Sequence, residues 1–158
     1  KRLSADALFV GAFPGAAPPL IGWTAVTGRM DLEGIAVFAV LFVWQLPHFL
    51  AIAHLCRDDY AAAGLRVHPV ERGDRATRRT ALFWALMQIP VSLLLVVLGT
   101  AGWIYAIVAV AAGLLYARAA ARWRGTGAEA IAQARALMFA SVVYLGSVFS
   151  ALLVDALL

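Results

Sequence analysis

Charged residues are scarce in this chain of 158 residues: Asp, Glu, Lys and Arg make up 14%, whereas 63% of the residues are hydrophobic. Soluble domains contain about 25% charged residues, so the composition excludes an ordinary soluble domain. It also excludes a disordered chain, because such chains are rich in charged residues and poor in apolar ones. The single cysteine, Cys56, rules out an internal disulfide framework and a paired-cysteine zinc or redox motif.

Long runs without any Asp, Glu, Lys or Arg indicate membrane spans. They are Ala7–Gly28, Gly34–Cys56, Thr80–Ala117 and Ala136–Val154. A membrane-spanning helix needs about 20 mostly apolar residues, and the third run would extend about 57 Å as one helix, nearly twice the hydrocarbon core. The glycines at 99 and 102 permit a turn within it. We therefore predict an all-α membrane protein that forms a single membrane domain with five transmembrane helices, at approximate spans 7–28, 34–56, 80–99, 102–117 and 136–154.

The first predicted span is unusual in its proline and glycine content. It contains Gly11, Pro14, Gly15, Pro18, Pro19 and Gly22. Both residue types disfavour a helix interior, so we expect a bent or broken helix here. Close helix packing through small residues is the alternative interpretation.

The basic residues predict the orientation of the spans. Of the 13 Lys and Arg residues, all but Arg29 fall on one side of the membrane if the chain crosses it five times. The positive-inside rule makes that side cytoplasmic. We therefore expect a multi-pass protein of the bacterial inner (cell) membrane. The start of the chain and the polar segment 57–79 would be cytoplasmic, and the C-terminus would lie outside.

The polar segment Arg57–Arg79 combines carboxylates with several arginines. Its acidic residues are Asp58, Asp59, Glu71 and Asp74. Carboxylate oxygens suit Mg²⁺, which usually binds one or two of them together with substrate phosphates, and arginine forks match phosphate oxygens. A diphosphate–Mg²⁺ site is therefore one interpretation. The other is an ordinary charged loop whose arginines only fix the topology.

Polar side chains also occur at membrane depth near the end of the second span. Gln45 and His48 flank Pro47, and polar residues in such positions usually face a bundle interior or a cavity. His48 could orient a substrate, transfer a proton or ligate haem iron. The alternative is an interhelical hydrogen bond. His54 and His68 are weaker candidates because they lie close to the polar segment.

Three segments together carry a family resemblance. They are GAAPPLIGW at 15–23, WQLPHF at 44–49 and RDDYAAAG at 57–64. The chain resembles the haem O synthase (protohaem IX farnesyltransferase) family of the UbiA prenyltransferase superfamily, and the resemblance covers its whole length. It implies a bundle of nine membrane helices, of which this chain would supply the last five as the C-terminal portion.

The resemblance also implies a reaction and a site. Farnesyl would pass from farnesyl diphosphate to a vinyl group of haem b, giving haem O and diphosphate, with Mg²⁺ as the cofactor. The residues that match the family's functional positions are Asp58 and Asp59 for catalysis and metal binding, Arg57, Lys1 and Arg2 for the diphosphate, and His48, Gln45 and Trp44 for haem. The partners implied are the two substrates, the lipid bilayer, and haem A synthase or terminal-oxidase assembly proteins, with no nucleic acid.

The sequence departs from the family pattern in two places. Arg66, Val67 and His68 stand where the family has a proline, methionine and leucine run. The family's first acidic motif is not in this chain, so we expect the chain to be inactive on its own. Two alternatives stay open: a UbiA-type enzyme acting on a phenolic or quinone acceptor, and a non-catalytic haem-binding assembly protein that does not need Asp58 or Asp59.

Overall fold

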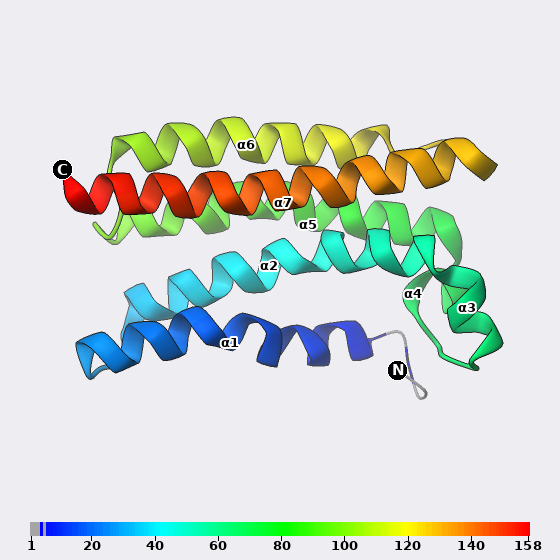
Figure 1. Ribbon diagram of the computed structural model, residues 1–158, viewed down its shortest axis with the longest axis horizontal. Coiled ribbons are helices and arrows are strands. Elements are labelled where there is room, and N and C mark those ends of the chain that lie inside the picture. The colour runs from blue at the N-terminus through cyan, green and yellow to red at the C-terminus, as the bar shows by residue number, and fades with distance from the viewer. Residues whose placement is uncertain (1–3, 5) are drawn as a thin grey trace.

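The computed structural model describes Ser4 and residues 6–158, and within them it is a helical bundle without strands (Figure 1). The helices are α1 (Ala7–Thr27), α2 (Leu32–Leu55), α3 (Arg57–Ala62), α4 (His68–Glu71), α5 (Gly73–Val97), α6 (Trp103–Arg122) and α7 (Gly127–Leu157). Five of them, all except α3 and α4, are long and apolar enough to cross a membrane. The predicted all-α fold with five membrane helices is therefore confirmed.

Helix α2 occupies the middle of the bundle, since it packs against α1, α5 and α7. The core is rich in alanine and contains three buried tyrosines, Tyr105, Tyr116 and Tyr144, together with leucines and valines. Alanines let helix backbones approach closely, as membrane bundles require. Helix α1 packs mainly on α2 and forms one edge of the bundle (Figure 1).

Two helices extend well past the charge-free runs. Helix α5 begins at Gly73 and α7 occupies Gly127–Leu157, whereas the runs there begin at Thr80 and Ala136. The absence of charge marks only the part of a helix that suits hydrocarbon, and a helix continues into the polar region where its residues favour it. The interpretation of residues 57–79 as a charged loop is therefore wrong about secondary structure. The alanines and arginines of this segment are good helix formers, and most of it is helical.

Helix α1 is continuous, so the break expected from its prolines and glycines does not occur. A proline removes one N–H donor, yet its fixed φ is the helical one. Gly28 then ends the helix with a φ of 68°, and its amide donates to the Thr24 carbonyl. Between α5 and α6 the chain turns at Gly99, where φ is 75°.

Helix α7 supplies hydrogen-bond acceptors at both ends of α6. Near one end, Gln133 Oε1 accepts from the amides of Arg124 and Gly125, each at 2.8 Å. Near the other, Asp155 Oδ2 accepts from the amides of Gly102 at 2.7 Å and Tyr105 at 2.9 Å. Asp155 thus caps the first turn of α6 from a neighbouring helix, and Gln133 holds the α6–α7 connection against the start of α7.

The predicted cytoplasmic segments gather at one end of the bundle. The start of α1, the short helices α3 and α4, and the α6–α7 connection lie together there, and the α1–α2 connection with Arg29 lies at the opposite end (Figure 1). An ion pair of 2.7 Å between Arg72 and Asp6 joins the start of α1 to the α4–α5 junction. This arrangement matches the expected separation of the basic residues.

Candidate functional site

The acidic pair Asp58–Asp59 lies in the first turn of α3, directly after α2 ends at Leu55. Both side chains are exposed. Neither makes a hydrogen bond or ion pair with any residue that the structure describes. A carboxylate held by no protein partner is available to a ligand. Consecutive helical residues point about 100° apart, however, so the two carboxylates face different directions.

The donor set fits the share of a Mg²⁺ site that protein carboxylates commonly supply, which is one or two groups completed by substrate phosphates and water. Across Ser4 and residues 6–158, no group of three or more His, Cys, Asp or Glu side chains is arranged to hold a metal ion. The described residues therefore provide two carboxylates and no protein cage. A Mg²⁺ ion at such a site would need the phosphate oxygens of a ligand to complete its coordination.

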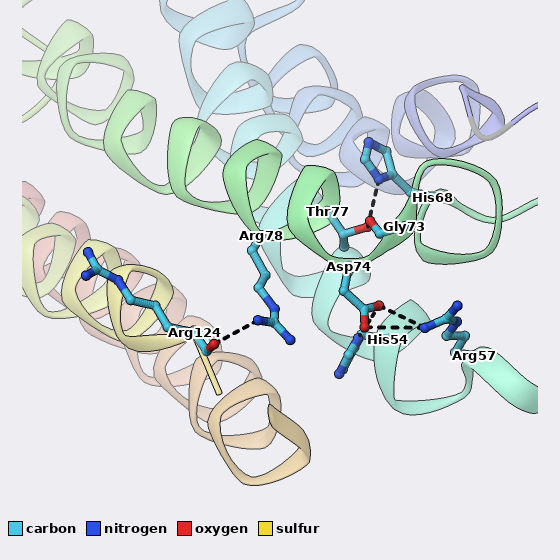
Figure 2. A network of polar contacts seen from close by, with 8 residues as sticks. All are labelled: His54, Arg57, His68, Gly73, Asp74, Thr77, Arg78 and Arg124. Atoms are coloured by element: carbon cyan, nitrogen blue, oxygen red, sulfur yellow. Dashed lines mark hydrogen bonds and ion pairs between the residues drawn. The ribbon is translucent and has the colours of Figure 1, made fainter. Parts of the chain in front are cut away.

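Arg57 directly precedes the acidic pair in the sequence, and its guanidinium is held by Asp74. Its Nη1 atom lies 3.2 Å and 3.3 Å from the two carboxylate oxygens of Asp74 on α5 (Figure 2). Asp74 Oδ1 is also 3.3 Å from His54 Nδ1, a close contact without hydrogen-bond geometry. The His54 ring meets the buried Trp123 edge-on at 5.0 Å. Asp74 thus links the start of α5 to the end of α2 and the start of α3.

His48 and Trp44 form one unit on α2 because residues four apart share a helix face. Their rings stack at 5.1 Å between centroids and 20° between planes. Both side chains are half-buried and both bond to Ser141 of α7. Trp44 Nε1 donates to the Ser141 carbonyl oxygen at 2.6 Å, and His48 Nδ1 lies 2.7 Å from Ser141 Oγ. The structure therefore brings two of the predicted haem-binding residues together.

Gln45 lies elsewhere, buried between α1 and α2. Its Nε2 atom donates to the Ala12 carbonyl oxygen at 2.7 Å. The close approach depends on Gly15, since a Cβ there would lie 2.5 Å from Gln45 Oε1. Helix packing accounts for this side chain. The other predicted positions, Lys1 and Arg2, lie outside the described residues.

A cavity of about 210 Å³ lies beside the acidic helix, between α1, the end of α2 and the α3–α4 connection. Its lining is mainly apolar, from residues such as Leu8 and Phe49, with Tyr60, Arg66 and His68 as polar groups. Ligand pockets usually measure about 300–1,000 Å³. The described residues therefore enclose space for part of a large ligand, such as a segment of an isoprenoid chain.

His68 is buried at the edge of this cavity. Its Nδ1 atom bonds Thr77 Oγ1 at 2.9 Å, and that hydroxyl donates to the Gly73 carbonyl oxygen at 2.9 Å (Figure 2). Burial, together with the nearby positive charge of Arg72, lowers the pKa of His68 below its usual value of 6.5. At neutral pH this residue is an uncharged structural link between α4 and α5.

The chain matches the UbiA prenyltransferase family over residues 1–157. It belongs to that family. Its curated relatives include proteins named "Protoheme IX farnesyltransferase" from Anaeromyxobacter sp. (strain Fw109-5), 51% identical over 99% of this chain, and from Anaeromyxobacter dehalogenans (strain 2CP-C), 49% identical over 96% of it. One from Sorangium cellulosum (strain So ce56) is 45% identical over 99% of this chain. These alignments cover 52%, 51% and 55% of the relatives, so this UbiA family member spans about half their length. No solved structure matches it.

Sequence reasoning did not find the groups that hold the candidate residues of this UbiA family member. They are Ser141, Asp74 and Tyr116, whose hydroxyl donates to the Trp44 carbonyl oxygen at 3.1 Å. The bundle centre likewise contains an unforeseen polar cluster of Gln88, Ser92 and Tyr144. Nothing in a single sequence indicates which distant helices meet, so no local signal points to these partners.

Proposed function

We propose that this chain takes part in the transfer of a farnesyl group from farnesyl diphosphate to a vinyl group of haem b, giving haem O and diphosphate. The observation that carries the proposal is the order of groups along α2 and α3. The His48–Trp44 pair lies within the apolar helix α2, and the end of α2 leads directly into α3 with its exposed acidic pair. The haem ring would thus bind beside Trp44 and His48 on α2, and the charged diphosphate would bind further along the chain, beside the acidic pair on α3. The names of the relatives support the same reaction.

The diphosphate would bind at the polar end of the bundle. Asp58 and Asp59 would supply the carboxylates for Mg²⁺, and the metal would contribute positive charge to the diphosphate. Arg57 would contribute a guanidinium to the same oxygens, and its ion pair with Asp74 fixes its starting position. Positive charge placed where negative charge develops lowers the barrier to breaking the carbon–oxygen bond.

The acceptor and the prenyl chain would lie deeper in the bundle. Trp44 and His48 offer a flat aromatic surface and a nitrogen for a porphyrin, and the mainly apolar cavity beside α3 offers room for prenyl carbons. The farnesyl carbon would lose its bond to the diphosphate oxygen and gain a bond to the terminal vinyl carbon. Water would then add its hydroxyl to the other vinyl carbon, and its remaining proton would leave with the diphosphate. Exclusion of bulk water from this region protects the allylic carbon until the vinyl group attacks.

A chimaera tests the proposal. In it, this chain replaces the matched half of the Anaeromyxobacter sp. relative, and haem O is measured by mass spectrometry in membranes supplied with haem b, farnesyl diphosphate and Mg²⁺. We expect haem O from the chimaera and a loss of at least about 100-fold when Asp58 and Asp59 are both changed to Asn. Glu129→Gln is the matched control, because Glu129 is an exposed acid at the same end of the bundle.

Two results would overturn the proposal. A chimaera that prenylates phenolic acceptors and not haem b would assign it another acceptor. An Asp58→Asn/Asp59→Asn variant with unchanged turnover would remove the acidic pair from the diphosphate site.

A further inference from the structure

Three hydrogen-bonding groups in α2 and α7 determine which His48 nitrogen carries the proton. Ser141 Oγ donates to the Met138 carbonyl oxygen at 2.6 Å and lies 2.7 Å from His48 Nδ1. A serine hydroxyl has one proton and a carbonyl oxygen can only accept. The proton of Ser141 is therefore committed to Met138, and the bond to His48 requires His48 Nδ1–H to donate. In its neutral form His48 is the Nδ1–H tautomer, and Nε2 carries the lone pair.

The Nε2 atom is free to bind a ligand. It makes no hydrogen bond to any described residue, and it is not among the buried polar atoms that lack a partner, so it keeps access to the surface of the chain. One face of the ring is covered by Trp44, which is itself anchored to the Ser141 carbonyl oxygen. The ring thus has a fixed orientation and one open nitrogen.

Ser141 is fully buried, and its hydroxyl oxygen bonds to the imidazole. We propose that Ser141 is a positioning residue that holds His48 with Nε2 directed at the iron of the haem substrate. The inference rests on the proposed function, since it assumes that haem is the acceptor. Histidines that bind a metal through one nitrogen nearly always donate the other N–H to a fixed acceptor, which orients the ring and makes the ligand more basic. Ser141 meets that requirement, and its own bond to Met138 prevents it from donating to the ring instead.

A second serine on the same helix separates this role from an ordinary helical hydrogen bond. Ser147 donates to the Val143 carbonyl oxygen at 2.8 Å and makes no contact with histidine. A serine in a helix commonly returns its proton to the preceding turn. Ser147→Ala therefore removes a comparable hydrogen bond from α7 and leaves His48 untouched, which makes it the matched control.

The experiment is a titration with ferrous haem b of the full chain and of the chimaera, followed by absorbance and by the iron–histidine stretching band in resonance Raman spectra. We expect His48→Ala to abolish the band. Ser141→Ala should lower its frequency and weaken haem binding about 10-fold, because the loss of the acceptor makes Nε2 a weaker donor and loosens the ring. Ser141→Thr, which keeps a hydroxyl, should restore both, and Ser147→Ala should leave both unchanged.

The role of Ser141 and the proposed function can fail independently. A Ser141→Ala variant with the wild-type band and affinity would overturn the role of Ser141. A band that persists in His48→Ala would overturn ligation by His48, while haem O formation by the chimaera would leave the proposed function intact. Failure of both wild-type proteins to bind haem would overturn the proposed function and the inference together. Thermal unfolding of each variant identifies any substitution that acts through misfolding. If Ser141→Ala misfolds, the band and the haem affinity of Ser141→Thr show whether the hydroxyl at this position is what positions His48.

Discussion

Gly15 and Gln45 meet so closely that a Cβ on Gly15 would lie 2.5 Å from Gln45 Oε1. Gln45 cannot move away without giving up its bond to the Ala12 carbonyl oxygen. We expect Gly15→Ala to destabilise the protein, because a buried amide that loses its partner costs about 1–3 kcal/mol. This loss exceeds the gain of about 0.5–1 kcal/mol from replacing glycine by alanine in a helix. The measurement is thermal unfolding in detergent.

Gly11→Ala is the control for that substitution. Gly11 lies one turn earlier in α1, and a Cβ there would meet nothing within 4 Å. We expect this variant to be as stable as the wild type or slightly more stable. Equal losses in the two variants would show that α1 needs flexible residues and not a close approach to Gln45.

The depressed pKa of His68 predicts a dependence of stability on pH. The unfolded chain has a histidine pKa of about 6.5, and the folded chain binds that proton less readily because His68 is buried near Arg72, with Asp6 and Glu71 opposing the effect. The contribution is therefore fully present above about pH 6.5 and is lost as the pH falls below it. We expect the melting temperature to fall between pH 7.5 and 5.5, and to fall less in His68→Gln. Parallel pH profiles for the two proteins would contradict the assignment.

The orientation of the bundle in the membrane can be tested by labelling cysteines introduced at its two ends, after Cys56 has been replaced. In a Cys56→Ser background, cysteine replaces either Arg29 or Thr126, which are exposed at opposite ends. We expect an impermeant maleimide to label Arg29→Cys in intact cells and Thr126→Cys only after the inner membrane is opened. The reverse pattern would mean that the basic end faces outward.

Asp155 should contribute to stability although it lies in the last turn of α7. Asp155→Ala would leave the amides of Gly102 and Tyr105 without their acceptor. Loss of such a cap costs about 1 kcal/mol, which corresponds to roughly 2–4 °C in melting temperature for a protein of this size. Asp155→Asn, which keeps an oxygen acceptor, should recover most of the loss. Equal melting temperatures for the two variants would show that the negative charge of Asp155, and not its hydrogen bonds to the two amides, stabilises the protein.

Composition predicted the fold because bilayer thickness limits helix length. The five long helices were predicted from the charge-free runs, and the turn near Gly99 was predicted from the length of the third run. Asp58 and Asp59 were found from their place in the polar segment. The helices within segment 57–79 were not predicted, because a polar segment between two apolar runs was interpreted as a loop. The partners of His48 and Gln45 could not be predicted, since Ser141 and Ala12 lie on other helices and their meeting depends on helix rotation and packing.

The hydrogen bonds that Gln133 and Asp155 accept have a mechanical consequence for the bundle. The two residues lie on α7 about 33 Å apart. Asp155 binds amides at the start of α6, and Gln133 binds amides in the connection just after its end. A slide or rotation of α6 along α7 would break both sets of bonds at once. The α6–α7 pair should therefore keep a single register. Helix α1, which packs mainly on α2, is held by fewer neighbours and should move more readily than that pair.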